Sequence, residues 1–183
     1  LVMSGSPAKT ARWINDFQQT SSIPLLVAAD AESGLGFRID SVPEFPAAQN
    51  LGAIRDNELV YRMGRHIGQQ LKALGMNMSF APVADVNTNH FNPVINMRSF
   101  GENWENVAAK ALAFARGLQD ERIAAVAKHF PGHGEPSGDS HRMLPLVQHP
   151  AARLDSVETY PFTVLSDYGI AGIMSGHLNV PAY

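Results

Sequence analysis

The chain has 183 residues, 45% of them hydrophobic and 17% charged, which is enough for one globular domain with a buried core. Its formal net charge of −3 gives no indication of binding to nucleic acid or to an anionic membrane surface. The lack of cysteine excludes disulfides and thiolate metal sites. No apolar run is long enough for a membrane span and no signal-peptide pattern is present, so we expect a soluble protein of unknown compartment.

Short apolar runs alternate with amphipathic helical patterns, which is typical of a parallel sheet with connecting helices. Strands are expected to end at residue 3 and to cover 24–29, 76–82, 123–129 and about 170–174. Helices are expected over 7–19, 57–74, 103–119 and 155–168, the last with a kink or a late start at Pro161. Long polar loops are expected over 31–50 and 87–101.

Caps and apolar stripes define these helices. Ser6 and Asp56 are candidate N-caps for the first two, and Asp155 with Glu158 forms a candidate capping box for the last. The expected buried faces are Ala11, Ile14 and Phe17 in the first helix, Leu59, Met63, Ile67, Gln70, Leu71 and Leu74 in the second, and Trp104, Val107, Ala111, Phe114 and Leu118 in the third.

Polar side chains follow the ends of several predicted strands. They are Asp30, Asp85, His129 and His177. A doubly wound sheet would gather them at one switch point, whereas a (β/α)8 barrel distributes functional residues over many strands. We therefore expect an α/β fold, a TIM barrel of which about five of the eight strands are present. Because the chain starts abruptly and stops just after a strand, we expect 1–183 to be one barrel domain truncated at both ends.

The most informative stretch has the sequence Lys-His-Phe-Pro-Gly-His-Gly over 128–134 and is followed by Asp139 and His141. It begins at the C-terminal end of a buried strand, where α/β barrels place their chemistry. A histidine can give and take a proton near neutral pH, with an aspartate orienting its ring, and the nearby glycines would let the loop close over a substrate. The alternative is an exposed turn aspartate and a solvated histidine.

Lys128 and His129 would donate hydrogen bonds to a polar ligand, or else form a buried ion pair and a satisfied core histidine. Asp30 and Arg38 bracket a glycine-rich loop. An aspartate suits a grip on neighbouring sugar hydroxyls, and an arginine offers a fork of donors. These two residues and Arg98, taken one at a time, are more often capped turns or surface ion pairs.

A metal site is the sharpest rival hypothesis, because His129, His133, Asp139 and His141 are all possible zinc ligands. The first two have the spacing of the helical pair in zinc peptidases. However, Pro131 between them disfavours a helix, and no glutamate follows the first histidine. We therefore expect no metal and no other cofactor.

The 128–134 stretch with Asp139-Ser140-His141 closely resembles the signature of glycoside hydrolase family 3, in its bacterial β-N-acetylglucosaminidase branch. The resemblance runs through nearly the whole chain. It includes Asp30-Ala31-Glu32, Phe45-Pro46-Ala47, Phe80-Ala81-Pro82-Val83-Ala84-Asp85 and Arg98-Ser99-Phe100-Gly101. The family usually has two glycines after its Asp-x-Glu, where this chain has Ser33 and Gly34, which bears on the loop shape near the aglycone.

This resemblance implies a TIM barrel and a retaining, two-step release of terminal β-linked N-acetylglucosamine from muropeptides or similar glycans in peptidoglycan turnover. It implies that His141 is the general acid/base and Asp139 its orienting partner. The residues implied to hold the sugar are Asp30, Arg38, Arg98, Lys128 and His129. The family's nucleophile is an aspartate on the next strand, so we expect the rest of the same chain to supply it and to complete the barrel, and 1–183 alone to be inactive.

Two other readings stay open. One is a metal-dependent barrel hydrolase, and the other is a catalytically inactive sugar-binding fragment. The resemblance places the protein in the bacterial cytoplasm or periplasm without choosing between them, and it leaves open whether water or phosphate is the acceptor.

Overall fold

The computed structural model describes residues 1–137 and 144–183. Four parallel strands form one sheet in the order β1-β2-β3-β4, so neighbours in the sheet are also neighbours in the sequence. Their bounds are Ala28–Ala29 for β1, Met78–Ser79 for β2, Ala124–Phe130 for β3 and Gly172–Ser175 for β4. Val2 forms a parallel bridge with Ala29 beside β1, in the position of the first predicted strand. This sequential order, with helical segments between successive strands, is that of a barrel sector and not of a doubly wound sheet.

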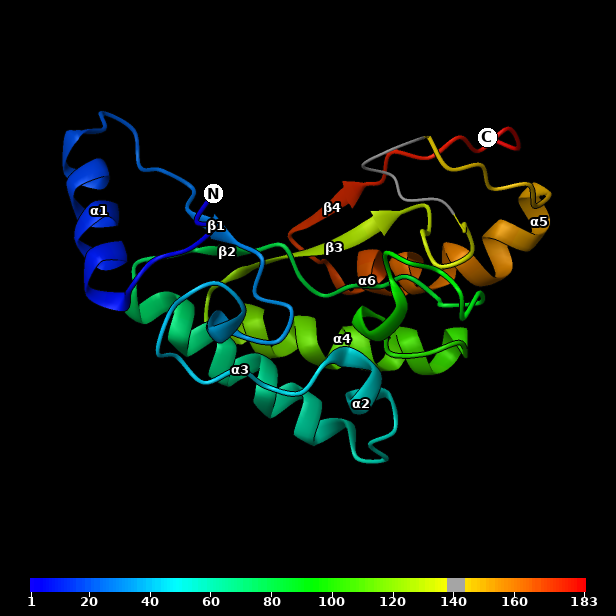
Figure 1. The fold of residues 1–183 in the computed structure, drawn as a ribbon, viewed down its shortest axis with the longest axis horizontal. Coiled ribbons are helices and arrows are strands. Elements are labelled where there is room, and N and C mark those ends of the chain that lie inside the picture. Colours follow the sequence, from blue (N-terminus) through cyan, green and yellow to red (C-terminus); the bar gives the residue numbers. More distant parts are fainter. Residues whose placement is uncertain (138–143) are drawn as a thin grey trace.

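Three helices, α3, α4 and α6, lie side by side along one face of the sheet (Figure 1). The helical segments in chain order are α1 (Pro7–Thr20), η1 (Leu35–Phe37), α2 (Ala48–Gly52), α3 (Asn57–Ala73), η2 (Asn96–Arg98), α4 (Trp104–Asp120), α5 (Ala151–Arg153), η3 (Leu154–Glu158) and α6 (Tyr160–Tyr168). The expected helices over 57–74 and 103–119 are thus confirmed to within one residue at each end. Asp56 caps α3 by accepting the Glu58 N–H at 2.9 Å, as its position in the sequence predicts.

Glycines let α3 and α4 approach closely. A Cβ on Gly64 of α3 would lie 2.4 Å from the Phe114 carbonyl oxygen, and one on Gly117 of α4 would lie 2.3 Å from the Tyr61 carbonyl oxygen. The buried face of α3 therefore consists of Val60, Met63, Gly64, Ile67, Gly68 and Leu71. The prediction of Leu59 on this face was wrong, because the glycine-centred contact turns it outward, where it is 48% exposed.

Strands β1 and β2 are much shorter than predicted. Side chains form hydrogen bonds with backbone N–H groups that would pair with the neighbouring strand in a longer sheet. Gln18 Oε1 accepts the Leu25 N–H at 2.9 Å, and Asn77 Oδ1 accepts the Val27 N–H at 2.8 Å. At the end of β2, Pro82 has no N–H to offer. The strand from Ala124 to Phe130 runs longer and carries the motif residues to the edge of the sheet.

The last predicted helix starts earlier than its capping box suggests. Helical turns begin at Ala151 and pass through the π-helical segment η3 before α6 begins at Tyr160. Glu158 does not cap anything, because its buried carboxylate is paired with Arg153 at 2.6 Å. Pro161 lies in the first turn of α6, where a proline costs no hydrogen bond, so α6 itself begins late, as expected, although helical turns precede it from Ala151.

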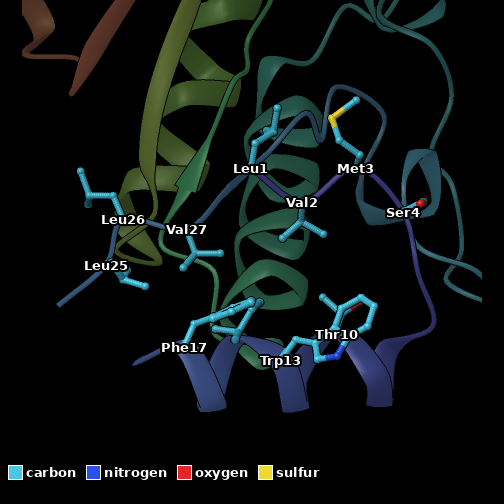
Figure 2. A pocket seen from close by; sticks show the side chains of 11 residues that line it. Leu1, Val2, Met3, Ser4, Thr10, Trp13, Phe17, Leu25, Leu26 and Val27 are labelled. Atoms are coloured by element: carbon cyan, nitrogen blue, oxygen red, sulfur yellow. The ribbon is translucent and has the colours of Figure 1, made fainter. Parts of the chain in front are cut away.

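The first helix buries less of its apolar stripe than expected. Ile14 is 4% exposed, but Phe17 is 63% exposed and Trp13 47%. These aromatic rings border an open pocket of about 390 Å³ between α1 and the extended segments 1–4 and 25–27 (Figure 2). In the part of the chain described here, no other element covers this side of α1, so the predicted stripe was right in spacing and wrong in burial.

Candidate active site

The site lies at the C-terminal ends of the strands, where Asp30 follows β1, Asp85 follows β2, and Lys128 and His129 lie at the end of β3. Arg98 reaches the same place from η2. Because the carboxyl ends of parallel strands meet at one edge of a sheet, residues from distant parts of the sequence converge there. None of the residues that line the pocket beside α1 belongs to this cluster.

Lys128 stands at the centre of the cluster, and its side chain is 3% exposed. Its Nζ lies 2.7 Å from Asp30 Oδ1 and 2.7 Å from Glu32 Oε1. An ammonium group has three N–H donors, so these two carboxylates leave one donor for a further acceptor. The sequence is compatible with a ligand-binding lysine or a buried ion pair. Among residues 1–137 and 144–183, Lys128 forms the ion pair and keeps one donor.

Glu32 is held by two cations. Arg98 grips it in bidentate fashion, with Nε 2.9 Å from Oε2 and Nη2 2.8 Å from Oε1, while Lys128 contacts it from the other side. Burial alone would raise the pKa of Glu32, yet the Arg98 hydrogen bonds and the charges of Lys128 and Arg98 lower that pKa to about 2. Glu32 is therefore a fixed carboxylate that keeps both cations in place.

Asp30 is bound at each of its oxygens. Oδ1 accepts from Lys128, and Oδ2 accepts from Arg38 Nη2 at 2.9 Å. The Asp30 side chain is 18% exposed, so part of it faces the open side of the site. A carboxylate oxygen that already accepts one hydrogen bond has lone pairs left for a ligand hydroxyl. An aspartate held in this way can accept from ligand hydroxyls, which is the capability that its residue type suggests.

Asp85 and His129 form a second, deeper pair. Asp85 Oδ2 lies 2.7 Å from His129 Nδ1, and the Asp85 side chain is fully buried. The Asp85 carboxylate also accepts the backbone N–H groups of His129 and of His133, the latter at 2.7 Å. Burial alone would raise the pKa of Asp85, but the attraction of His129 and these hydrogen bonds lower it.

His133 lies behind this pair. Its ring is buried, and burial lowers its pKa. Neither ring nitrogen has a hydrogen-bond partner among the residues that the structure describes. Its carbonyl oxygen accepts from Asn92 Nδ2 at 2.7 Å, which fixes the turn after β3 to the 87–95 loop.

The structure brings together the five residues that the sequence suggests for the sugar, namely Asp30, Arg38, Arg98, Lys128 and His129. Sequence reasoning missed Glu32 and the pairing of Asp85. A signal existed for both, because each is an acidic residue beside a strand end that carries another polar residue. Asp139 and His141, predicted as the proton-transfer pair, lie outside the described residues.

The zinc hypothesis gains no geometric support from the described part of the chain, residues 1–137 and 144–183, which contains no group of three or more candidate ligands placed to hold a metal ion. His129 Nδ1 is committed to Asp85, and the His129 and His133 rings are 6.0 Å apart between centroids. Two of the four proposed ligands, Asp139 and His141, are not among these residues.

The charges of the cluster balance. In the described part of the chain, three cations, Lys128, Arg38 and Arg98, pair with Asp30 and Glu32, and a third carboxylate, Asp85, pairs with His129. Such a site has many directed donors and acceptors without a large net field. It suits an uncharged ligand rich in hydroxyl groups better than a phosphate or a carboxylate.

Parallel strands in sequential order, with a polar cluster at their carboxyl ends, define a domain of the α/β-barrel class. The sequence from residue 7 to residue 183 matches the profile of the glycosyl hydrolase family 3 N terminal domain, so the chain belongs to that family. Its expected α/β-barrel fold is thereby confirmed, as a partial barrel.

Individual proteins that are similar to this chain support the same family. A beta-hexosaminidase A of Pseudoalteromonas piscicida is 36% identical over 171 residues, which are 90% of this chain and 29% of that protein. The solved structure of a glycoside hydrolase family 3 beta-N-acetylglucosaminidase from Paenibacillus sp. str. FPU-7 superimposes with a TM-score of 0.90 at 39% identity, over 98% of this chain and 37% of that one.

A third similar protein is NagZ from Neisseria gonorrhoeae, solved in complex with N-trifluoroacetyl-D-glucosamine. Its TM-score is 0.89 at 32% identity, over 97% of this chain and 54% of that one. The chain thus spans between about a third and about a half of the length of these relatives.

Proposed function

We propose that the protein is a β-N-acetylhexosaminidase that releases terminal β-linked N-acetylglucosamine by a retaining mechanism, and that residues 1–183 carry its sugar-binding half. The observation that carries this proposal is the Asp30–Lys128–Glu32 arrangement, with Arg38 and Arg98 closing it on either side. The family membership supports the reaction class, and the relatives named beta-hexosaminidase support the sugar.

The binding roles follow from the contacts. Asp30 accepts from hydroxyls of the sugar ring, and the free Lys128 N–H donates to one of their oxygens. Arg38 holds Asp30 in position, while Arg98 and His129 approach the ring from the η2 and β3 side. Because Asp30 and Lys128 are already oriented by their partners, little side-chain entropy is lost when the sugar binds.

Proton transfer is assigned to His141, with Asp139 as its orienting partner. In the first step an aspartate of the same protein, in sequence after residue 183, attacks the anomeric carbon while His141 protonates the leaving oxygen. In the second step His141 takes a proton from water, which attacks the same carbon and releases the aspartate. Both transfers require a group that titrates near neutrality, which suits an imidazole.

We further propose N-acetylglucosamine-containing muropeptides or related glycans as substrates, in the bacterial cytoplasm or periplasm, with the rest of the protein completing the barrel. N-trifluoroacetyl-D-glucosamine bound to the Neisseria relative supports an acylated glucosamine in the site. Among the residues that the structure describes, no helix combines the length and apolar character needed to cross a membrane.

The proposal is tested with the full-length protein and two aryl glycosides, 4-nitrophenyl N-acetyl-β-D-glucosaminide and 4-nitrophenyl β-D-glucoside. We expect release of nitrophenol from the first at a much higher kcat/KM than from the second, with the β-configured sugar as the first product. Residues 1–183 alone should bind the sugar without turnover. Activity that vanishes on metal chelation would favour the metal-dependent hydrolase, and full-length binding without turnover would favour the inactive sugar-binding protein.

A further inference from the structure

Asp85 is the most completely enclosed charged group in the site. Its side chain has no exposed surface, and it accepts from His129 Nδ1 at 2.7 Å, from the His129 N–H at 3.2 Å and from the His133 N–H at 2.7 Å. None of the proposed catalytic steps uses it. A buried carboxylate with several donors around it serves a neighbour rather than solvent.

These contacts fix which nitrogen of His129 carries a proton. An ionised carboxylate only accepts hydrogen bonds, and the backbone N–H groups of His129 and His133, which donate to Asp85, favour its ionised form. His129 Nδ1 must therefore be the protonated nitrogen, since it lies 2.7 Å from Asp85 Oδ2. In a neutral imidazole this leaves a lone pair on Nε2.

Arg98 gives independent support for the same tautomer. Its Nη2 lies 3.5 Å from His129 Nε2, and a guanidinium group can only donate. If His129 Nε2 carried a hydrogen, two N–H donors would face each other, one from Arg98 and one from His129. The His129 side chain is 17% exposed. A neutral ring has one lone pair on Nε2, and the 3.5 Å contact with Arg98 is at the far end of the hydrogen-bond range, so a ligand hydroxyl that donates to Nε2 replaces this contact.

We propose that Asp85 is a positioning residue that fixes His129 as a hydrogen-bond acceptor at Nε2, so that the site recognises a ligand hydroxyl which donates its proton to this nitrogen. This inference deepens the proposed function and rests on it for the ligand being a sugar. It also revises the sequence-based expectation that His129 donates to the ligand.

A purely structural role for Asp85 must be separated from its proposed effect on the His129 ring. Asp85 also holds the turn after β3, because it accepts the His133 N–H. Asn92 offers a matched control. It is buried, and its Nδ2 donates to the His133 carbonyl oxygen at 2.7 Å, so it anchors the same turn without touching the His129 ring. The isosteric exchanges Asp85→Asn and Asn92→Asp each disturb one anchor of that turn.

The exchange at Asp85 has a defined consequence for the ring. The His133 N–H can only donate, so it retains the amide oxygen of an asparagine at this position. The amide NH2 then faces His129 Nδ1, which must become an acceptor, and the proton moves to Nε2. Asn92→Asp leaves the carboxylate at position 85 in place and should leave the tautomer unchanged.

The test is 15N NMR of the histidine rings of the full-length protein at about pH 8, where an unperturbed histidine is neutral. The signals of His129 are assigned by their loss in His129→Gln. We expect a protonated Nδ1 and an unprotonated Nε2 in the wild type and in Asn92→Asp, and the reverse in Asp85→Asn. A protonated Nε2 in the wild type would overturn the proposal even if Asp85→Asn does not fold, as would an unchanged pattern in a folded Asp85→Asn.

A kinetic readout accompanies the spectra. We expect Asp85→Asn to lower kcat/KM on the N-acetylglucosaminide by about 10- to 100-fold, chiefly through KM, which is the effect of one lost charge-assisted contact. A loss no larger than that of Asn92→Asp would contradict the positioning role. Since the ring-nitrogen measurement needs no substrate, its result is independent of whether the proposed glycosidase activity is found.

Discussion

Lys128 Nζ lies midway between two carboxylates, 2.7 Å from Asp30 Oδ1 and 2.7 Å from Glu32 Oε1. The lysine lies at the end of β3, and both acids lie in the segment after β1. Asp30 and Lys128 are 98 residues apart in the sequence. This one ammonium group therefore ties the two acids to the strand that leads into the motif loop. Arg38 and Arg98 in turn pair with these same two acids.

Lys128→Met should destabilise the protein by about 3–5 kcal/mol, because removing one partner of a buried ion pair leaves uncompensated charge. The free energy of unfolding in urea measures this. Lys110→Met is the matched control, since Lys110 is equally buried but donates to the Ile54 carbonyl oxygen and to Asn57 in a contact between α4 and the start of α3. A smaller loss for Lys128→Met than for Lys110→Met would mean that the two carboxylates do not depend on this ammonium group for their compensation.

Glu32 gives the protein a specific pH dependence. Its pKa is about 2 in the folded protein and near 4.5 in the unfolded chain, so its pairing contributes stability above pH 4.5 that is lost as the pH falls toward 2. The difference corresponds to roughly 3 kcal/mol at neutral pH. We expect the stability difference between the wild type and Glu32→Gln to shrink over this pH range. Urea unfolding at several pH values measures this stability difference. A difference that stays constant down to pH 2 would show that the pKa of Glu32 is not lowered by its pairing.

Arg98→Lys should weaken sugar binding although it keeps the charge. Arg98 holds Glu32 through two nitrogens and Val94 through a third, and a lysine cannot reproduce this fork. We expect KM to rise about 10-fold, the effect of a lost charge-assisted hydrogen bond, with kcat less affected. Arg65→Lys is a suitable control because Arg65 pairs with Glu121 on the surface between α3 and α4. Equal kinetics for the two variants would show that the fork geometry is unimportant.

His141→Ala should separate substrates by their leaving groups. If His141 protonates the leaving oxygen, aryl glycosides with good leaving groups should keep most of their rate in the first step, while alkyl glycosides and natural glycans should lose far more. Pre-steady-state release of the aglycone measures this step directly. Equal losses for good and poor leaving groups would remove His141 from the general-acid role.

The sequence predicts the helices well where local signals decide their ends. Asp56 and Asn103 cap α3 and α4 with their own side chains, and both helices begin within one residue of the expected start. The prediction fails where a contact with another side chain determines the local structure. Glu158 looks like half of a capping box, but its buried pairing with Arg153 holds it in the π-helical turn instead.

The site follows the same rule. Asp30, Lys128 and His129 stand at strand ends, which the hydrophobic pattern reveals, and their convergence follows from a parallel sheet. The pairings of Glu32 and Asp85 were not predicted, because their contacts reach across 66 residues to Arg98 and across 44 residues to His129. Local patterns mark both as acidic residues near strand ends, but they do not show which distant residue each one pairs with.

Sugar binding to the cluster is tested most directly by calorimetric titration of N-acetylglucosamine into the full-length wild type, Lys128→Met and Lys110→Met. We predict measurable binding to the wild type and to Lys110→Met, with loss of at least about 10-fold in affinity for folded Lys128→Met, since one charged donor and the orientation of Asp30 are removed together. Unchanged affinity in folded Lys128→Met would contradict the account.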